Sequence, residues 1–138
     1  MRVPMSTVSP LPHLFNVLVV DDDEDSVESL AFCLQQEGRV VRCAMSGEEA
    51  LAMAETFTPH IALVDIFMPR LDGHALAQQL RRRFGTSTVL VAVTGAVRSV
   101  DLGTFDFQLT KPVNFVRLEE LFEHAQQRAG FGARRPGA

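Results

Sequence analysis

The chain has 138 residues, of which 46% are hydrophobic and 22% charged, with a formal net charge of −4 at pH 7. This length predicts a single domain with its own core and leaves no room for a second, output domain. The acidic balance argues against direct nucleic-acid binding, because such proteins carry a basic footprint. No apolar run approaches the ~20 residues of a membrane span, and early prolines interrupt any signal-peptide core, so we expect no membrane contact and a cytoplasmic location.

The two ends of the chain lack the periodicity of helices or strands. Residues 1–13 carry three prolines, and residues 129–138 read AGFGARRPGA. We therefore expect a flexible N-terminal segment at 1–13, a folded domain at 14–128 and a flexible C-terminal tail at 129–138. Cys33 and Cys43 have neither CxxC spacing nor the density of a disulfide scaffold, and are predicted to be small buried hydrophobes.

Five short runs rich in β-branched residues predict strands, and helical patterns separate most of them. The runs are Asn16–Val20, Val40–Ala44, Ile61–Val64, Val89–Val93 and Phe107–Leu109. The third and fourth are apolar throughout, as in strands that are covered on both faces. Strands that alternate with helices predict an α/β fold with a parallel sheet between two helical layers.

Apolar residues at helical spacing predict four helices. The first combines Val27, Leu30, Ala31 and Leu34 with a capping pair, Asp25 and Glu28, and is expected to stop at Gly38. The others contain Ala50, Leu51 and Ala54; Leu76, Leu80 and Phe84; and Phe115, Leu118 and Phe122. Arg81, Arg82 and Arg83 end the third of these and are expected to stay solvated. The stretch Gly95–Asp106 leaves room for barely two helical turns.

Reactive side chains follow four of the five predicted strands. They are Asp21 and Asp22 after the first, Asp65 after the third, Thr94 after the fourth and Lys111 after the fifth. The ligand crevice of an open parallel sheet lies at the carboxyl ends of its strands, where strand order reverses. This pattern places the first and third strands side by side at the centre, with their carboxylates facing one another, and the second strand at an edge.

Clustered carboxylates need a neutralising partner, because each pair at 4 Å repels by about 4 kcal/mol at an effective dielectric near 20. Either one carboxyl takes a proton, or an oxygen-preferring cation such as Mg²⁺ binds among them. Zinc is a poor candidate, since neither cysteine nor histidine joins the cluster. Lys111 and Thr94 would complete a phosphoryl site, in which a central carboxylate acts as nucleophile and forms an acyl phosphate.

Simpler interpretations exist for each part of this cluster. Asp23 to Asp25 could be no more than an acidic helix N-terminus, stabilised by the helix dipole. Asp65 alone could be a turn or cap residue, and Thr94 an ordinary strand end. However, side chains suited to phosphoryl chemistry follow four of the strands, and this combination favours a functional site.

Four stretches in order give the chain a specific resemblance to the receiver domain of two-component response regulators. They are VLVVDDDED at Val17–Asp25, LVDIFMPRLDG at Leu63–Gly73, VAVTG at Val91–Gly95 and LTKPV at Leu109–Val113. The resemblance spans Val17 to about Arg128. It implies a flavodoxin-like, doubly wound, five-stranded parallel sheet of order 2-1-3-4-5, with a shortened fourth helix between Gly95 and Asp106 in this chain.

The resemblance also implies a role for each site residue. Asp65 would accept a phosphoryl group from a histidine kinase or a histidine phosphotransfer protein. Mg²⁺ would be held directly by Asp22, Asp65 and the Phe67 carbonyl, with Asp21 acting mainly through water. Thr94 and Lys111 would contact the phosphoryl oxygens, helped by backbone N–H groups near Phe67 and Gly95. Lys111–Pro112 resembles the family's cis peptide, and the protein would be a signalling receiver that catalyses only its own phosphorylation and dephosphorylation.

Two departures from the family pattern concern the output surface. Gln108 stands where the family usually has an aromatic residue that follows the strand 4 hydroxyl, while Phe107 points to the opposite face of the strand. The interval from Thr94 to Lys111 is shorter than usual by about a helical turn or more. We therefore expect a monomer rather than the family's usual dimer, and a closer similarity to stand-alone and hybrid-kinase receivers.

Two other classes of protein remain as alternatives. A haloacid-dehalogenase-like phosphatase would use Asp21 as nucleophile and Asp23 as acid and base, but it prefers Thr or Val where this chain has Asp25, and it leaves the Asp65 loop unexplained. A nucleotide- or flavin-binding module needs a phosphate-cradling glycine loop after the first strand. Here that loop is DDDED, which would repel phosphate.

Overall fold

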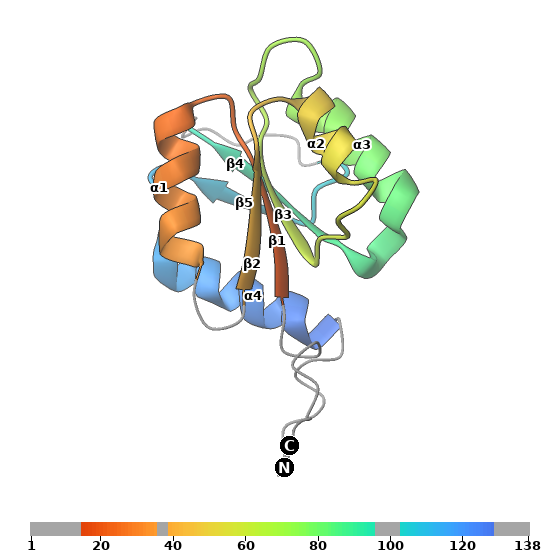
Figure 1. Cartoon of the computed structure of the whole chain (residues 1–138). Helices are drawn as coiled ribbons and strands as arrows, with labels where there is room; N and C mark the ends of the chain where they lie inside the picture. The colour runs from red at the N-terminus through yellow and green to blue at the C-terminus, as the bar shows by residue number, and fades with distance from the viewer. Residues whose placement is uncertain (1–14, 36–38, 96–102, 129–138) are drawn as a thin grey trace, which may run out of the picture.

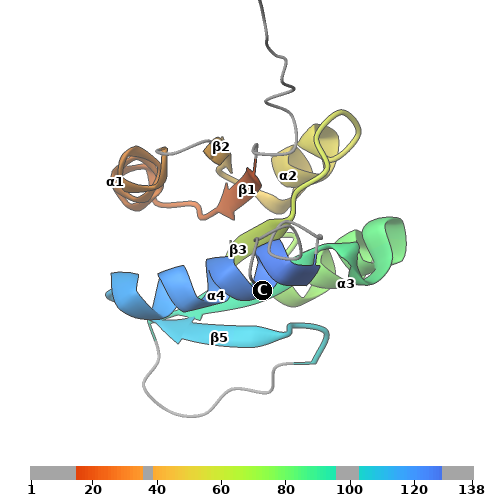
Figure 2. The ribbon, with the colours of Figure 1, turned by 90° about the horizontal axis from the view of Figure 1, so that it is seen from below.

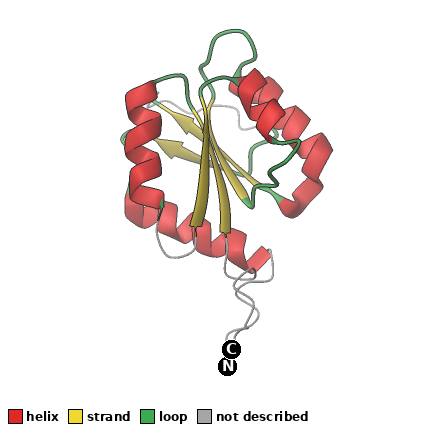
Figure 3. Ribbon diagram, viewed as in Figure 1, coloured by secondary structure: helices red, strands yellow, loops and turns green. Residues whose placement is uncertain are grey.

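A computed structural model describes residues 15–35, 39–95 and 103–128, and the structural statements below concern these ranges. The strands are β1 (Phe15–Val20), β2 (Arg39–Ala44), β3 (Ile61–Asp65), β4 (Val89–Thr94) and β5 (Phe107–Thr110). They form one parallel sheet of order β2-β1-β3-β4-β5 (Figures 1 and 3). The predicted fold and strand order are confirmed, and each strand differs from its prediction by one residue at one end.

Four helices in the described part of the chain cover the two faces of the sheet. They are α1 (Glu24–Leu34), α2 (Gly47–Met53), α3 (Gly73–Phe84) and α4 (Phe115–Arg128), and a short 3-10 turn, η2 (Gly85–Ser87), follows α3. Figure 2 shows α1 and α4 on one side of the sheet and α2 and α3 on the other. No helix in the described ranges has the length and apolar character needed to cross a membrane. Most of the Gly95–Asp106 stretch, where the shortened helix was expected, lies outside the described ranges (residues 96–102), as do the predicted tails.

The core has two halves, one on each face of the sheet, because neighbouring strand residues point to opposite faces. Leu18, Ala62 and Leu90 pack with α2 and α3. Val19, Leu63 and Val91 pack with α1 and α4. Every residue of β3 and β4 is buried, as the continuous apolar runs predicted.

Two of the helices start where a short polar side chain accepts a hydrogen bond from a backbone N–H of the first turn. Ser46 accepts a hydrogen bond from the Glu49 N–H, and the Glu49 side chain accepts one from the Met45 N–H, so α2 begins with a reciprocal pair similar to a capping box, shifted by one residue. Asp72 caps α3 by accepting the Ala75 N–H at 2.9 Å.

The predicted start of α1 was wrong. Its N-cap is Asp23, two residues before the predicted capping pair, and this side chain makes no hydrogen bond to the backbone of the first turn. Instead it accepts a hydrogen bond from the Ser26 hydroxyl at 2.8 Å. Several consecutive acidic residues satisfy the sequence preferences of a helix start equally well, so these preferences alone do not choose among them. The helix ends at Leu34, and Gly38 lies outside the described ranges.

Three predictions about individual side chains need correction. Cys33 is exposed and Cys43 half-buried, so neither is the buried small hydrophobe that was expected, and both are free thiols. Phe115 is 47% exposed at the first position of α4, before that helix reaches the core. Each lies at the margin of an element, where helical or strand periodicity does not determine burial.

The arginines at the end of α3 were also predicted too simply. Arg81 donates to the carbonyls of Gly85, Thr88 and Thr104, and pairs with Asp106 at 2.8 Å. Arg83 donates to the carbonyl of Ala54. Arg82 is exposed, and among the described residues no contact of its side chain is recorded. Only Arg82 therefore fits the expectation of a solvated cation.

Candidate functional site

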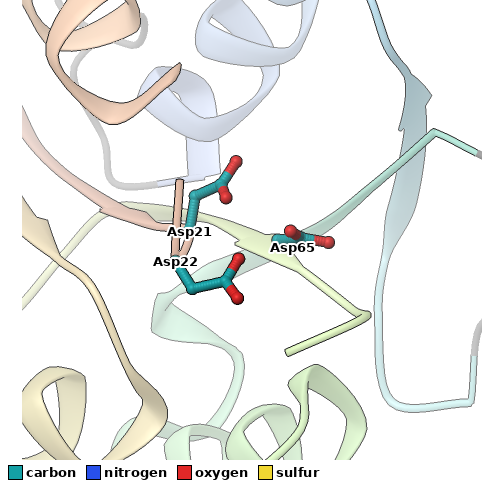
Figure 4. A group of neighbouring side chains, drawn as sticks. All are labelled: Asp21, Asp22 and Asp65. Carbon is teal, nitrogen blue, oxygen red and sulfur yellow. The ribbon is translucent and has the colours of Figure 1, made fainter. Parts of the chain in front are cut away.

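Three carboxylates meet at the carboxyl ends of the two central strands. Val20 pairs with Val64, so the next residues, Asp21 and Asp65, leave β1 and β3 side by side. One carboxylate oxygen each from Asp21, Asp22 and Asp65 lie within 4.8 Å of one another (Figure 4). Asp21 and Asp65 are buried, with 7% and 8% exposure, whereas Asp22 is exposed. The structure thus brings together the three carboxylates that the sequence predicted.

The side chain of Lys111 supplies positive charge to this cluster. Its Nζ lies 2.9 Å from Asp21 Oδ2 and 3.7 Å from Asp65 Oδ2. The Lys111 backbone N–H donates to the Thr94 carbonyl at 2.8 Å, which fixes the loop after β5 against the end of β4. The Lys111–Pro112 peptide is cis, as the family resemblance implied.

Burial and charge shift the pKa values of two site residues. Burial raises the pKa of Asp65 above its ordinary value, and the charge of Asp21 adds to this, although the Phe67 N–H and Lys111 oppose it. Burial by itself would lower the pKa of Lys111, but the hydrogen bond and charge of Asp21 outweigh it, so the pKa is raised. Lys111 is therefore a stable cation. The positive groups near Asp65 do not fully offset the cost of burying its negative charge.

The loop after β3 is shaped by a close approach that only glycine allows. The Phe67 N–H donates to Asp65 Oδ1 at 3.1 Å, and the Gly73 N–H donates to the Ile66 carbonyl. A Cβ at Gly73 would lie 2.5 Å from Ile66 Cα and 2.7 Å from the Asp65 carbonyl oxygen. Arg70 has a positive φ of 62°, which turns the chain between these two contacts. The first turn of α3 therefore abuts the backbone of Asp65 directly.

Thr94 and its neighbours lie at the same edge of the sheet. Thr94 is fully buried at the end of β4, and Gly95 is exposed beside it. Gln108 is half-buried in β5, where it pairs with Ala92 of β4. Phe107 packs on the face covered by α4, with its ring 5.0 Å from that of His124. The two residues therefore serve opposite faces, as strand alternation predicted.

Asp23 and Asp25 do not join the carboxylate cluster. Both are exposed at the start of α1, so the simple interpretation as an acidic helix N-terminus holds for them. It fails for Asp21, whose Oδ1 accepts the Asp23 N–H while its Oδ2 accepts from Lys111. Asp21 is thus a partner of Lys111, with both oxygens engaged.

An apolar pocket of about 660 Å³ opens beside Lys111. One wall is the flank of α1 with Ser26, Ser29 and Cys33, and the other is the loop from Lys111 to Phe115. Asp21 and Gly95 also line it, so the pocket is continuous with the charged site. Sequence periodicity did not predict this pocket, because Phe115 has the spacing of a core residue but lines the pocket instead.

The donor set fits a hard divalent cation. Three carboxylates meet one ammonium group, which leaves net negative charge in a partly buried site. All donors in the cluster are oxygens, and no histidine or cysteine belongs to any such cluster within residues 15–35, 39–95 and 103–128. Oxygen ligands of this kind suit Mg²⁺ rather than Zn²⁺.

Comparison with known proteins identifies the family. The family model described as "Response regulator receiver domain" matches residues 17–123, which is most of the chain. This chain is a member of the response regulator receiver domain family. Receiver domains of this family are signalling domains that histidine kinases phosphorylate, and the haloacid-dehalogenase-like alternative is not favoured.

Individual relatives support the assignment of this receiver domain. It is 34% identical over 114 residues to an uncharacterized 14.6 kDa protein of Leptolyngbya boryana, covering 78% of this chain and 87% of that protein. It is 37% identical over 101 residues to the alkaline phosphatase synthesis transcriptional regulatory protein PhoP of Bacillus subtilis, covering 70% of this chain. The match spans only 42% of PhoP.

A solved receiver structure shows the same fold. The response regulator protein TrrA of Thermotoga maritima, in complex with Mg²⁺ and BeF, superimposes with a TM-score of 0.72 and 27% identity. The match covers 81% of this chain and 99% of that one. The likeness extends across the ordered core of the receiver domain.

Proposed function

We propose that this receiver domain takes a phosphoryl group from a phosphohistidine onto Asp65, as a step of a two-component system or phosphorelay. The observation that carries the proposal is the position of Asp65, a buried carboxylate next to Asp21 and within 3.7 Å of the Lys111 ammonium. Asp21 is a poorer nucleophile, because Lys111 and the Asp23 N–H already engage its two oxygens.

Phosphoryl transfer to Asp65 breaks one bond and forms one. The carboxylate Oδ2 attacks phosphorus, the P–N bond to the donor imidazole breaks, and its electron pair leaves on the ring nitrogen. The product is an acyl phosphate on Asp65. Lys111 offsets the negative charge on the phosphoryl oxygens, and we assign the Thr94 hydroxyl and the backbone N–H groups at Phe67 and Gly95 as their hydrogen-bond donors.

The proposal includes Mg²⁺, which would be held by Asp22, Asp65 and the Phe67 carbonyl, with Asp21 contributing through water. When bound, it would neutralise negative charge on the carboxylates and on the incoming phosphoryl group. The exposure of Asp22 leaves this side of the site open to an ion and its waters.

The donor would be a histidine kinase or a histidine phosphotransfer protein. A helix that carries the phosphohistidine could rest in the pocket between α1 and the loop from Lys111 to Phe115. That pocket is mostly apolar and opens directly beside Lys111, so apolar side chains would hold the donor while its imidazole faces Asp65.

A phosphorylation assay tests the proposed acceptor. The protein is incubated with Mg²⁺ and labelled acetyl phosphate, or with a phosphorylated histidine phosphotransfer protein, and should acquire an acid-stable, base-labile label. Asp65→Asn should lose the label, because the amide cannot form an acyl phosphate, whereas the control Asp25→Asn should keep it. A label that persists in Asp65→Asn but disappears in Asp21→Asn would contradict the proposal and support the phosphatase alternative.

A further inference from the structure

A second groove lies on the outer flank of α1, away from the pocket beside Lys111. It has a volume of about 400 Å³ and is lined by α1 residues, among them Glu24, Glu28 and Phe32, and by Cys43 and Met45 at the end of β2. The pocket beside Lys111 uses the other flank of the helix, at Ser26, Ser29 and Cys33. We call the second site the α1–β2 groove.

The floor of the α1–β2 groove is apolar and its largest side chain is exposed. Val27 and Ala31 are buried beneath it. Phe32 is 80% exposed, the highest value among the large hydrophobic side chains in the described ranges, and Met45 is 36% exposed beside it. A contiguous apolar surface of this kind, next to a depression, is typical of a site that another molecule covers.

The rim of the groove is negatively charged. Glu24 and Glu28 line it, and none of its described lining residues is Lys, Arg or His. The pKa of the Cys43 thiol is raised, mainly by burial and then by the negative charges of Glu28 and Glu49, which agrees with an acidic rim. An acidic rim repels nucleic acid and anionic lipid surfaces, and attracts lysine and arginine side chains.

We propose that the α1–β2 groove binds a short basic amphipathic segment of a partner protein. Apolar side chains of the segment would pack on Phe32 and Met45, and its lysine or arginine side chains would pair with Glu24 and Glu28. This site is separate from the phosphoryl site, so the proposal does not depend on the phosphorylation of Asp65. It gives the domain a second surface through which a partner can be held while the site beside Lys111 stays accessible.

A defined peptide tests this binding. The probe is a fluorescein-labelled amphipathic helical peptide of leucine and lysine, and fluorescence anisotropy with the full chain should give a Kd of about 10–100 µM at low salt. Phe32→Ser and Glu28→Lys should each weaken binding by about tenfold. The matched controls, Val116→Ser and Glu123→Lys on α4, remove an exposed apolar group and a surface charge elsewhere, and should leave the Kd unchanged.

Three further measurements decide whether the α1–β2 groove is the site. NMR shifts induced by the peptide should centre on Phe32 and Met45. The affinity should fall as salt increases, and a leucine and glutamate peptide should not bind. The proposal would be overturned if wild type and Phe32→Ser bound the basic peptide equally well, or if the acidic peptide bound as tightly as the basic one. It would also be overturned if the protein bound anionic vesicles more strongly than neutral ones, or if the NMR shifts centred on Lys111.

Discussion

The three site carboxylates have different surroundings, and we therefore expect them to have different roles. Asp21 is buried and bonded to Lys111, so it orients the Lys111 ammonium group. Asp65 is buried and lies farther from that ammonium, which leaves its charge available for reaction. Asp22 is exposed and contributes negative charge without a recorded hydrogen bond in the described ranges. Because the Asp22 side chain is exposed, its removal should cost the fold little.

We expect Asp22→Asn to lose Mg²⁺-dependent phosphorylation while its melting temperature without Mg²⁺ stays the same or rises. Removing one of three neighbouring carboxylates relieves repulsion, by no more than about 1 kcal/mol because water screens an exposed group. Thermal unfolding in EDTA measures this effect, and acetyl phosphate labelling measures the function. Asp25→Asn is the control: it should keep labelling and lose a little stability, since it removes an acidic group from the first turn of α1. A clear drop in the melting temperature of Asp22→Asn would show a structural role for Asp22.

Helix α3 connects the candidate site with the opposite edge of the sheet. Its first residue, Gly73, abuts the backbone of Asp65. Near its end, Arg81 binds carbonyls of η2, of the residue before β4 and of the segment before β5, as well as Asp106. Asp106 also accepts the Leu90 N–H, so β4, β5 and α3 converge on one ion pair. The position of α3 is therefore fixed at both ends by polar contacts, with an apolar face between them.

Arg81→Ala should lower the free energy of unfolding by about 1.5–3 kcal/mol, because several charge-assisted hydrogen bonds are lost together. Chemical denaturation measures the change. Arg82→Ala, one residue along, should change stability by less than about 0.5 kcal/mol, because this side chain is solvated. Arg81→Lys should recover only part of the loss, since one ammonium cannot span all four acceptors. Equal stability of the two alanine variants would show that the Arg81 contacts are dispensable.

The sequence predicted helices and strands well where a residue pattern repeats. It predicted poorly those features that depend on a single contact between distant residues. β3 and β4 were evident because continuous apolar runs have few other uses, and Asp21, Asp65 and Lys111 because each directly follows a strand. Arg81 was misjudged because its acceptors come from three segments that only the fold brings together. The close approach at Gly73 has no signature beyond that of an ordinary turn glycine. The exposure of Phe32 was equally invisible, because periodicity does not predict which margin of a helix another element covers.

Across the whole molecule, the two edges of the sheet have different chemistry. The carboxyl ends of the strands collect the carboxylate cluster, whereas at their amino ends uncharged hydrogen bonds around His60 join the three central strands, beside the Arg81–Asp106 ion pair before β4 and β5. The His60 Nδ1 accepts the Asn16 N–H at 2.9 Å, and its backbone bonds to both Asn16 and Val89, so it joins β1, β3 and β4. Its ring stacks on Phe15 at 5.2 Å. Burial lowers the pKa of His60, in agreement with a neutral ring that accepts a hydrogen bond.

This lowered pKa predicts that the domain loses stability as the pH falls from about 6.5 toward 5. The unfolded chain takes up the proton first, so the contribution of His60 is complete above the unfolded pKa and is lost below it. The effect should stay below about 1 kcal/mol, because the ring is partly exposed. Urea unfolding at several pH values measures it. His60→Asn should flatten this pH dependence and His124→Asn should not, while an unchanged slope in His60→Asn would assign the effect to another group.

The exposed ring of Phe67 has a spectroscopic consequence. The chain contains neither tryptophan nor tyrosine, so its intrinsic emission is almost dark. Phe67 is 62% exposed, and its N–H bonds to the Asp65 carboxylate. A Phe67→Trp variant would therefore carry a lone fluorophore, two residues from Asp65, in a position that accommodates a large ring. Its emission should shift when Mg²⁺ and beryllofluoride are added, and a second substitution, Asp65→Asn, should abolish the shift. A single aromatic side chain would then report the occupancy of the site in real time.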